Sequence, residues 1–384
     1  MKKIVLATAL TAILLNAQNI KENKALELEN QKNKQTLESE LTKDSWINSL
    51  SINADSTKSK SGDSKSTSNK VYLDFNQDIF RSGGILYTIH KGKLQKDLAF
   101  KTYDKNLNAL NIDIFKTVLE LNKIDLQIKK QNYLIKNKTL EIEKKEEQYL
   151  NSLIDIEELD SAIIEKNDLL NQIEDLKTSK DDFLKQLKTL SSSKYQDIKV
   201  QRLHVVELEK YLDSNKELII KDLNMKISKK DLDITNSNYL PKISLFSQLG
   251  YEDNNQSDIN DDYYNYGVRV SIPFDYNMNK QKQISRINYN LSKIKKTIKK
   301  DEEINKYKNS ISTLKRIDNK IKNTKKSIES YKRIYKLTKN LVEGFFKTKQ
   351  DLKTIKNRLE SSKIDIDILN IDKQLIIYDL YKNI

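Results

Sequence analysis

The sequence predicts a mostly helical chain with a small β part, built as a duplicated repeat in which a strand hairpin accompanies a long helical hairpin. Three observations predict this fold class. The chain resembles itself at a shift of 193 positions. Its 384 residues include only seven Gly and two Pro, which favours a few very long elements. The hydrophobic period changes from that of a helix to that of a strand once in each copy.

The duplication is visible at places far apart in the chain. The shift of 193 positions superimposes segment 46–52 on 239–245, Asn151 on Gly344 and Leu159 on Leu352. Such a repeat fixes the architecture before any single element is considered. We expect a first repeat over residues 18–210 and a second over residues 211–384, after a signal peptide over residues 1–17.

The N-terminal segment predicts export. A short basic start at residues 1–3 precedes an apolar stretch over residues 4–15, and Ala17 offers a small residue for cleavage. The stretch is too short to span a bilayer as a helix. A buried N-terminal helix is the alternative, but the polar run from Gln18 begins too abruptly for one. No other segment approaches eighteen apolar residues, so we expect no transmembrane helix and a mature chain that works beyond the inner membrane.

Composition excludes several classes of function. The net charge of +14 allows nucleic-acid binding, but positive and negative residues alternate along helices, which is typical of solvated faces. The chain has no Cys and only two His, at 90 and 204, so disulfides, thiolate sites and His-based metal centres are not expected. The acidic segment 253–262 lacks the Gly and Glu of a calcium loop. We therefore predict no enzyme, no cofactor, no metal and no nucleic-acid partner.

Each copy contains one predicted strand pair. In the first copy the alternating segments are about 46–56 and 70–80, separated by a Ser- and Lys-rich stretch at 58–69 that we expect to be a solvated loop. In the second copy they are about 242–251 and 264–274, and the acidic, Asn-rich loop between them covers 252–262.

The remaining segments have helical patterns. Residues 86–150 and 278–343 predict two rods of about 95 Å each, at about 1.5 Å per residue. A heptad seam follows each hairpin tip and agrees in phase between the copies. Its positions are Leu159, Ala162, Lys166, Leu169, Ile173, Leu176, Lys180, Phe183 and Leu187 in the first copy, and Leu352, Ile355, Leu359, Ser362, Ile366, Leu369, Lys373, Ile376 and Leu380 in the second. Shorter helices are expected over 18–44 and 212–238, with a small belt at 201–212.

Four strands cannot close a membrane barrel, because the smallest barrels need about eight. An open sheet with one apolar face would leave edges and a hydrophobic surface exposed. A barrel shared between subunits resolves this, with eight strands from two copies or twelve from three, apolar side chains facing lipid and polar ones facing water. Tyr251, Tyr263, Tyr264 and Tyr266 suit an interfacial aromatic belt. A soluble β-sandwich within one chain is the alternative.

Short motifs in both copies resemble the outer-membrane efflux protein repeat of the TolC family. In the second copy, segment 238–245 with Pro241 resembles the start of the first strand, and segment 267–274, ending in Pro273 and Phe274, resembles the second. The tip of the second helical hairpin resembles the family's helical-tip pattern at Gly344, Thr348, Asp351 and Leu352. In the first copy Gln77, Phe80, Gly83 and Gly84 resemble the strand-end motif with its glycine pair.

The resemblance implies a homotrimer that forms a twelve-stranded outer-membrane β-barrel in outer-membrane lipid, continued by a periplasmic α-helical barrel. It implies a passive exit duct of a tripartite efflux pump or type I secretion system, with a periplasmic adaptor (membrane fusion) protein and an inner-membrane transporter of the RND or ABC type as partners. The other reading is a periplasmic coiled-coil structural or adaptor protein without a pore. Adaptors add Gly- and Val-rich β-modules that the sequence lacks.

The resemblance also implies that the tip turns, at Asn151 and Gly344, lie at the periplasmic end. Family tips carry carboxylates that narrow the closed pore. The first copy keeps Glu157, Glu158 and Asp160 there, but the second has Gln350 and Lys353 where acids are common, with Lys347 and Asp351 beside them. A Lys–Glu contact that holds the tip closed is a possible substitute for an acidic ring, and solvated helix-end charges are the alternative. Asn151 is expected to tolerate a left-handed turn in place of Gly.

Overall fold

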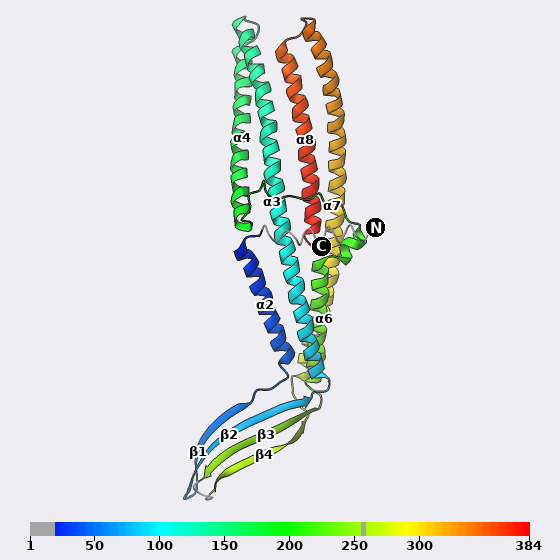
Figure 1. Cartoon of the computed structure of the whole chain (residues 1–384). Helices are drawn as coiled ribbons and strands as arrows, with labels where there is room; N and C mark the ends of the chain where they lie inside the picture. Colours follow the sequence, from blue (N-terminus) through cyan, green and yellow to red (C-terminus); the bar gives the residue numbers. More distant parts are fainter. Residues whose placement is uncertain (1–19, 255–258) are drawn as a thin grey trace. The chain divides into compact units, whose positions relative to one another are not determined.

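The computed structural model describes residues 20–254 and 259–384, so the predicted signal peptide lies outside the described residues. Figure 1 shows the elements in chain order. They are α2 (Glu22–Asp44), β1 (Ser51–Ser61), β2 (Ser64–Phe80), α3 (Gly84–Leu150), α4 (Ile156–Leu190), α5 (Leu208–Asp213), α6 (Lys216–Ser237), β3 (Lys242–Asn254), β4 (Ile259–Ser271), α7 (Met278–Glu343) and α8 (Lys349–Tyr381). The two long helices have 67 and 66 residues because almost no Gly or Pro interrupts them.

The duplication predicted from the sequence recurs in the element boundaries. α3 ends at Leu150 and α7 at Glu343, which are 193 positions apart. β1 ends at Ser61 and β3 at Asn254, again 193 positions apart. The described chain nevertheless divides into two compact units that each draw on both repeats. One unit contains 20–28, 105–215 and 302–384, and the other contains 29–104 and 216–301.

The first unit is a layer of helices whose order follows from ion pairs between neighbours. The Lys180 ammonium lies 2.5 Å from Asp125 and joins α4 to α3, Lys130 and Asp365 join α3 to α8 at 2.7 Å, and Lys373 joins α8 to α7. Buried apolar side chains from α3 and α8, with α5 and the segment before it, form the core. They include Ile112, Phe115, Leu121, Leu203, Tyr211, Tyr378 and Leu380.

The heptad seam of α4 is confirmed by burial. All nine predicted positions are buried or half-buried, and Leu159, Ala162, Ile173 and Leu187 are the most buried residues of this helix. The seam of α8 is also covered, but this helix buries further residues beside it, including Ile364, Leu375 and Tyr378. The difference arises because α8 is paired on two sides, by α3 and α7, whereas α4 is paired to α3.

The second unit contains the sheet and a layer of helices ordered α2, α3, α6 and α7. Lys96 of α3 contacts Glu40 of α2 at 3.0 Å, Lys91 contacts Asp231 of α6 at 2.7 Å, and Lys296 of α7 contacts Asp222 of α6 at 2.5 Å. The sheet is antiparallel throughout, in the order β1-β2-β3-β4 (Figure 1). β1 and β4 are therefore its outer strands.

Register separates the side chains of the sheet into two unlike faces. Ile52 lies opposite Leu73, Leu73 opposite Leu249, and Leu249 opposite Tyr264, so these residues share one face. Apolar side chains that are 36–73 % exposed continue this face: Val71, Phe75, Leu245, Tyr251, Tyr266, Val268 and Val270. The other face is mainly polar and includes Asn53, Tyr72, Asp74, Gln248, Asn265 and Arg269. Of the four tyrosines predicted to form a belt, Tyr263 lies on this polar face, opposite Gly250.

The predicted strand limits were wrong in the first copy. The stretch 58–69 is not a loop, because β1 and β2 continue through it to a two-residue turn at Gly62 and Asp63. Polar cross-strand pairs such as Ser56 with Asn69 replace the apolar alternation that the prediction required. The first strand begins at Ser51 and not near residue 46. In the second copy β3 extends to Asn254, and β4 begins at Ile259 and ends at Ser271, before the expected 274.

Candidate functional site

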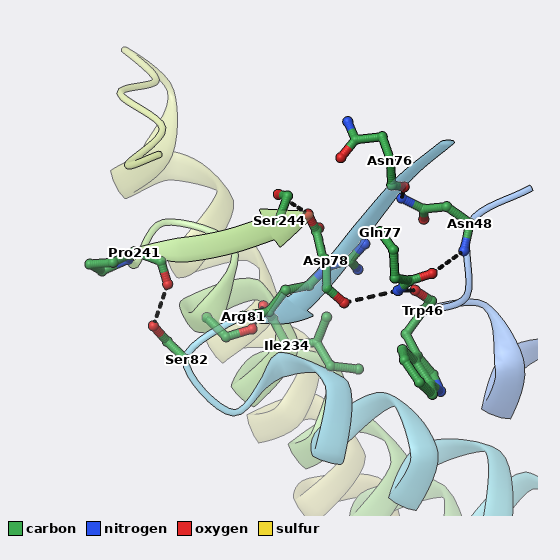
Figure 2. Close-up of polar contacts among 11 residues, drawn as sticks. Trp46, Asn48, Asn76, Gln77, Asp78, Arg81, Ser82, Ile234, Pro241 and Ser244 are labelled. Atoms are coloured by element: carbon green, nitrogen blue, oxygen red, sulfur yellow. Dashed lines mark hydrogen bonds and ion pairs between the residues drawn. The ribbon is translucent and has the colours of Figure 1, made fainter. Parts of the chain in front are cut away.

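The strand-end residues lie where the sheet joins the helices of the second unit (Figure 2). The Gln77 side chain fixes the chain that enters β1: its Oε1 accepts from the Asn48 backbone N–H at 3.0 Å, and its Nε2 donates to the Trp46 carbonyl at 2.9 Å. These two side-chain hydrogen bonds, called the Gln77 clamp below, stand where a strand pair would have backbone hydrogen bonds. These bonds hold the segment that leads into β1, in which residues 45–47 form a turn and residues 48–50 belong to no strand.

Asp78 holds β2 to β3 beside a bulge at Asp78/Phe80. Its carboxylate, in a residue that is 6 % exposed, accepts from the Ser244 hydroxyl at 2.5 Å and from Arg81 Nε at 2.6 Å. Phe80 ends the strand opposite Ile243 and is half exposed. The bulge changes the direction of β2 where the strand ends.

The glycine pair makes the turn from β2 into α3. Ser82 and Gly83 both have positive φ, 47° and 88°. The Ser82 hydroxyl donates to the Pro241 carbonyl at 2.7 Å, which ties this turn to the start of β3. Gly84 is required for packing, because a Cβ at this position would lie 2.5 Å from Ser237 Oγ of α6.

The structure therefore brings together Gln77, Gly83, Gly84 and Pro241 of the predicted strand-end motif. Pro273 lines a cavity of about 260 Å³ at the same junction, together with Asp78, Arg81, Ser237, Asn238, Leu240 and Lys242. Phe274 is not part of this packing, since its side chain is 96 % exposed.

Both hairpin tips lie in the first unit and have the same backbone geometry. Leu153 N–H donates to the Gln148 carbonyl at 2.8 Å and Ser152 N–H to Tyr149 at 2.8 Å, and the same bonds recur 193 positions later from Phe346 to Leu341 and from Phe345 to Val342. These are the two hydrogen bonds of a Schellman motif. The turns follow the helix ends at Asn151 and Gly344, and the left-handed residues are the next ones, Ser152 (φ 56°) and Phe345 (φ 64°). The left-handed conformation expected at Asn151 is therefore wrong by one position.

The return helices start differently in the two copies. Thr348 and Asp351 form a capping box: the Thr348 hydroxyl accepts from the Asp351 N–H at 3.1 Å, and the Asp351 carboxylate accepts from the Thr348 N–H at 3.1 Å. Burial alone would raise the pKa of Asp351, but the Thr348 hydrogen bonds, with Lys144 and Lys347 nearby, hold that pKa below its usual value. At the matching position of the first copy, Asp155 makes no side-chain cap hydrogen bond.

The candidate gate charges do not form one cluster in the described part of the chain. Lys145 of α3 contacts Glu158 within the first hairpin, 3.6 Å from its carboxylate and 2.9 Å from its carbonyl. A hydrogen bond from Gln350 Nε2 to Glu143 Oε2 at 3.1 Å joins the two hairpins near this end. No ion pair joins Lys353 to Glu157, Glu158 or Asp160 among the described residues. The gate therefore stays a prediction.

Two polar features of the first unit were missed at the level of sequence. Glu303 of α7 is only 2 % exposed and accepts from the Tyr211 hydroxyl, from Asn215 Nδ2 at 3.0 Å and from Asn383 Nδ2. Burial, followed by the hydrogen bond to Glu303, raises the pKa of Tyr211. Nothing in the run 301–303 distinguishes this glutamate from its exposed neighbours, so only tertiary structure reveals the cluster.

The second missed feature is an ion-pair ladder between α3 and α8. Its rungs are Lys116 with Asp379 at 2.5 Å, Lys123 with Asp372 at 2.9 Å, and Lys130 with Asp365 at 2.7 Å. Successive rungs are seven residues apart on both helices, so the ladder follows one face of each. The heptad spacing of Lys and Asp in the sequence could have predicted it.

Residues 20–254 and 259–384 contain no cluster of three or more His, Cys, Asp or Glu side chains able to hold a metal ion. Among the described helices, none is both long enough and apolar enough to cross a membrane.

Comparison with known proteins gives the class of this fold. No family model and no curated protein matches the chain by sequence. The structure is similar to the Campylobacter jejuni CmeC outer membrane channel, with a TM-score of 0.75, 16% identity and coverage of 95% of this chain and 83% of that one. It is similar to the outer membrane protein VceC of Vibrio cholerae, with a TM-score of 0.75, 12% identity and coverage of 93% and 92%. The open state of the Neisseria gonorrhoeae MtrE outer membrane channel gives a TM-score of 0.70, 12% identity and coverage of 95% and 86%.

The chain thus has the fold of the outer-membrane efflux channels, the fold expected from its resemblance to the TolC family.

Proposed function

We propose that this protein is an outer-membrane efflux channel, a passive exit duct that assembles as a homotrimer with a twelve-stranded barrel. The observation that carries the proposal is the two-faced sheet. A continuous apolar face is exposed on four strands whose outer members, β1 and β4, each pair with one strand in the described chain. Further copies would close the edges, place the apolar face in outer-membrane lipid and turn the polar face to a water-filled bore.

An unpaired apolar seam on α7 supports assembly. Its five side chains follow the 3-4 spacing of a heptad and are 46–55 % exposed: Ile284, Ile287, Leu291, Ile294 and Ile298. α2, the other outer helix of this layer, also exposes Leu37 and Leu41. Neighbouring copies would bury these two faces against one another and extend the helical layer into a periplasmic barrel.

The tips support docking to a periplasmic adaptor that links the duct to an inner-membrane transporter, of the RND type in an efflux pump or the ABC type in a type I secretion system. Large apolar side chains stand at both turns, with Leu150 81 % and Phe345 96 % exposed. Exposed apolar groups at two equivalent turns suit burial by a partner. The competing reading, a periplasmic coiled-coil structural or adaptor protein without a pore, leaves the apolar face of the sheet without a function.

Single-channel recording with two matched variants tests the proposal. Val268→Arg places a charge on the apolar face, while Asn265→Arg places the same charge on the polar face of the same strand, β4. We expect the wild-type protein to fractionate with outer membranes and give stepwise conductance. Val268→Arg should destabilise the inserted barrel by about 2–4 kcal/mol per chain, whereas Asn265→Arg should insert and shift ion selectivity toward anions. A wild-type protein that needs no detergent and gives no conductance would overturn the proposal.

A further inference from the structure

The two repeats meet inside the sheet, where β2, the last strand of the first repeat, pairs with β3, the first strand of the second. Ser68 lies opposite Asn254 and Asp78 opposite Ser244, so the two residue numbers of each pair in this part add up to 322. At the edges of the sheet, β4 ends the second repeat and β1 begins the first. In a closed ring of copies, β4 of one copy would lie beside β1 of the next, which is a second junction of the same kind.

The strands of the two repeats correspond at two different shifts. β1 ends at Ser61 and β3 at Asn254, 193 positions later, which is the shift of the whole duplication. The partner of Ser61 in the first strand hairpin is Ser64, whereas the partner of Asn254 in the second is Ile259, 195 positions after Ser64. β2 therefore corresponds to β4 at a shift of 195.

The bulge in β2 agrees with this correspondence. Between Asp78 and Phe80, β2 contains one residue more than β3, whereas β4 pairs with β3 without interruption. After the bulge the shift falls from 195 to 194, which places Phe80 on Phe274. α3 and α7 also begin 194 positions apart, at Gly84 and Met278. The shift along the strands thus leads to the observed start of each helix.

We propose that β4 of each copy pairs with β1 of the next in a register whose residue numbers add up to 324, with Arg269 opposite Asp55. The total exceeds 322 by two, because β4 stands 195 positions after β2 whereas β1 stands 193 positions before β3. The inference rests on the proposed function, since it needs copies that form a ring. It adds to that function the partner of each outer strand and the residues that align the copies.

This register keeps the two faces of the sheet continuous from one copy to the next. Val268 and Val270 of the apolar face lie opposite Ser56 and Ala54 of the next copy, which are on the same face as Ile52. A displacement by one residue would bring the apolar side chains of one copy beside the polar face of the next. Only registers displaced by an even number of residues therefore keep an apolar face around the whole barrel.

Two charged side chains of the polar face await partners at the outer strands. The Arg269 guanidinium lies over the Phe246 ring, 4.9 Å from its centroid, and forms no ion pair with a described residue. The Asp55 carboxylate accepts from the Tyr72 hydroxyl at 3.0 Å and has no cation within ion-pair distance in the described part of the chain. Both side chains are exposed, one on β4 and the other on β1.

A displacement by two residues in either direction would separate this pair of charges. Arg269 would then lie opposite Asn53 or Thr57 of the next copy, neither of which is charged. Opposite charges that face each other across two strands stabilise the pairing of those strands. Arg269 and Asp55 therefore favour one register among those that keep the apolar face continuous.

Disulfide cross-linking of the full-length protein in membranes tests the register, because the sequence has no Cys of its own. Val268→Cys is combined with Ser56→Cys, which lies opposite it in the proposed register, and separately with Ala54→Cys or Lys58→Cys, each displaced by two residues. Opposite Cβ atoms are about 4.5–5.5 Å apart and diagonal ones about 7–8 Å, while a disulfide needs about 3.5–4.5 Å. After oxidation we expect about fivefold more covalent trimer from the pair with Ser56→Cys than from either displaced pair.

Exchange of the two charges tests the residues that align the copies. Arg269→Asp places two carboxylates opposite each other and should lower the ratio of trimer to monomer in native mass spectrometry about threefold. Arg269→Asp with Asp55→Arg restores opposite charges and should recover most of the trimer. Arg269→Asp with Asn53→Arg is the matched control, which supplies the same charge two residues away and should recover less.

Three results would overturn the register. Stronger cross-linking of Val268→Cys with Ala54→Cys or Lys58→Cys would show that the copies align differently. Equal or absent cross-linking of all three pairs in a protein that conducts would show that β4 and β1 do not pair in a fixed register. Equal recovery by Asp55→Arg and Asn53→Arg would show that this charge pair does not align the copies. Conductance of the wild type, recorded in parallel, separates these failures from failure of the proposed function, in which the wild type itself does not conduct.

Discussion

At the residue scale, two positions at the junction between sheet and helices show how single side chains set the path of the chain. Gly84 and Ser237 show this, since the α3 backbone passes so close to the α6 side chain that no Cβ fits between them. The side-chain amide of Gln77 makes two hydrogen bonds to the backbone of the segment before β1, where a paired strand would use its own backbone groups. Each residue sets the path of the chain at the junction between sheet and helices.

Gly84→Ala should destabilise the second unit by about 1–3 kcal/mol, because the added Cβ meets Ser237 Oγ at 2.5 Å and overpacking costs energy of this order. Chemical unfolding followed by circular dichroism in detergent measures the change. The double variant Gly84→Ala with Ser237→Ala removes the hydroxyl and should recover part of the loss. Equal stability of the single variant and the wild type would show that the two helices can move apart without cost.

Sequence reasoning identified residues that belong to short local motifs, and it missed residues whose partners are distant in the chain. The turn residues Gly83, Gly84 and Gly344 were predicted because they stand in short motifs that resemble those of a known family, and of the three only Gly83 has a positive φ. Trp46 was misassigned to a strand, because its alternation with Leu50 and Ile52 looks like a β pattern, while the Gln77 clamp lies 31 positions away. Glu303 and the cavity at Arg81 were missed for the same reason: their partners are distant in the chain.

At the element scale, the two hairpins share a backbone but differ in how their return helices begin. The Thr348 box caps α8, while Asp155 leaves α4 without a side-chain cap hydrogen bond. Because the pKa of Asp351 is lowered in the folded protein, its contribution to stability is present above the ordinary carboxyl pKa and is lost as the pH falls through the lowered value.

Thr348→Ala should destabilise the start of α8 by about 0.5–2 kcal/mol, the usual cost of losing a side-chain cap. Asp155→Ala, at the equivalent position of α4, should cost less, since no cap hydrogen bond is lost. Hydrogen exchange of the first turns of α8 and α4 reports each effect separately. Faster exchange at α4 in Asp155→Ala than at α8 in Thr348→Ala would contradict the assignment.

The ladder between α3 and α8 should contribute little per rung but should set the register of the two helices. For the rung of Lys130 and Asp365, a double-mutant cycle should give a coupling of about 0.2–1 kcal/mol that falls at high salt. The exchanged pair, Lys130→Asp with Asp365→Lys, should recover most of the stability lost in either single variant. A coupling near zero at low salt would show that the two side chains lie close together but contribute no measurable stability as an ion pair.

At the scale of the whole molecule, the described chain exposes the surfaces that a closed assembly would bury. The lengths of the helices and the types of element were predictable, because Gly and Pro are scarce and the hydrophobic period changes from that of a helix to that of a strand in each copy. The limits of β1 and β2 were not, because their distal halves are Ser-, Lys- and Thr-rich and hydrophobic period cannot detect a strand that is solvated on both faces.

Ile294→Asp should prevent trimer formation, because it places a carboxylate in the middle of the exposed seam of α7. Lys293→Asp introduces the same side chain on another face of the helix and should leave the trimer intact. Mass photometry or native mass spectrometry in detergent distinguishes the two outcomes. A trimer that persists in Ile294→Asp would show that the copies do not contact one another through this seam.

The turn at Gly62 and Asp63 closes a hairpin whose last side chains are all solvated, from Lys58 through Lys65. Lengthening or trimming this arm would disturb no packed side chain. It is therefore the place where a fluorophore or an affinity peptide could be grafted with least harm, and because the whole sequence has no Cys, a single engineered thiol there would react without competition.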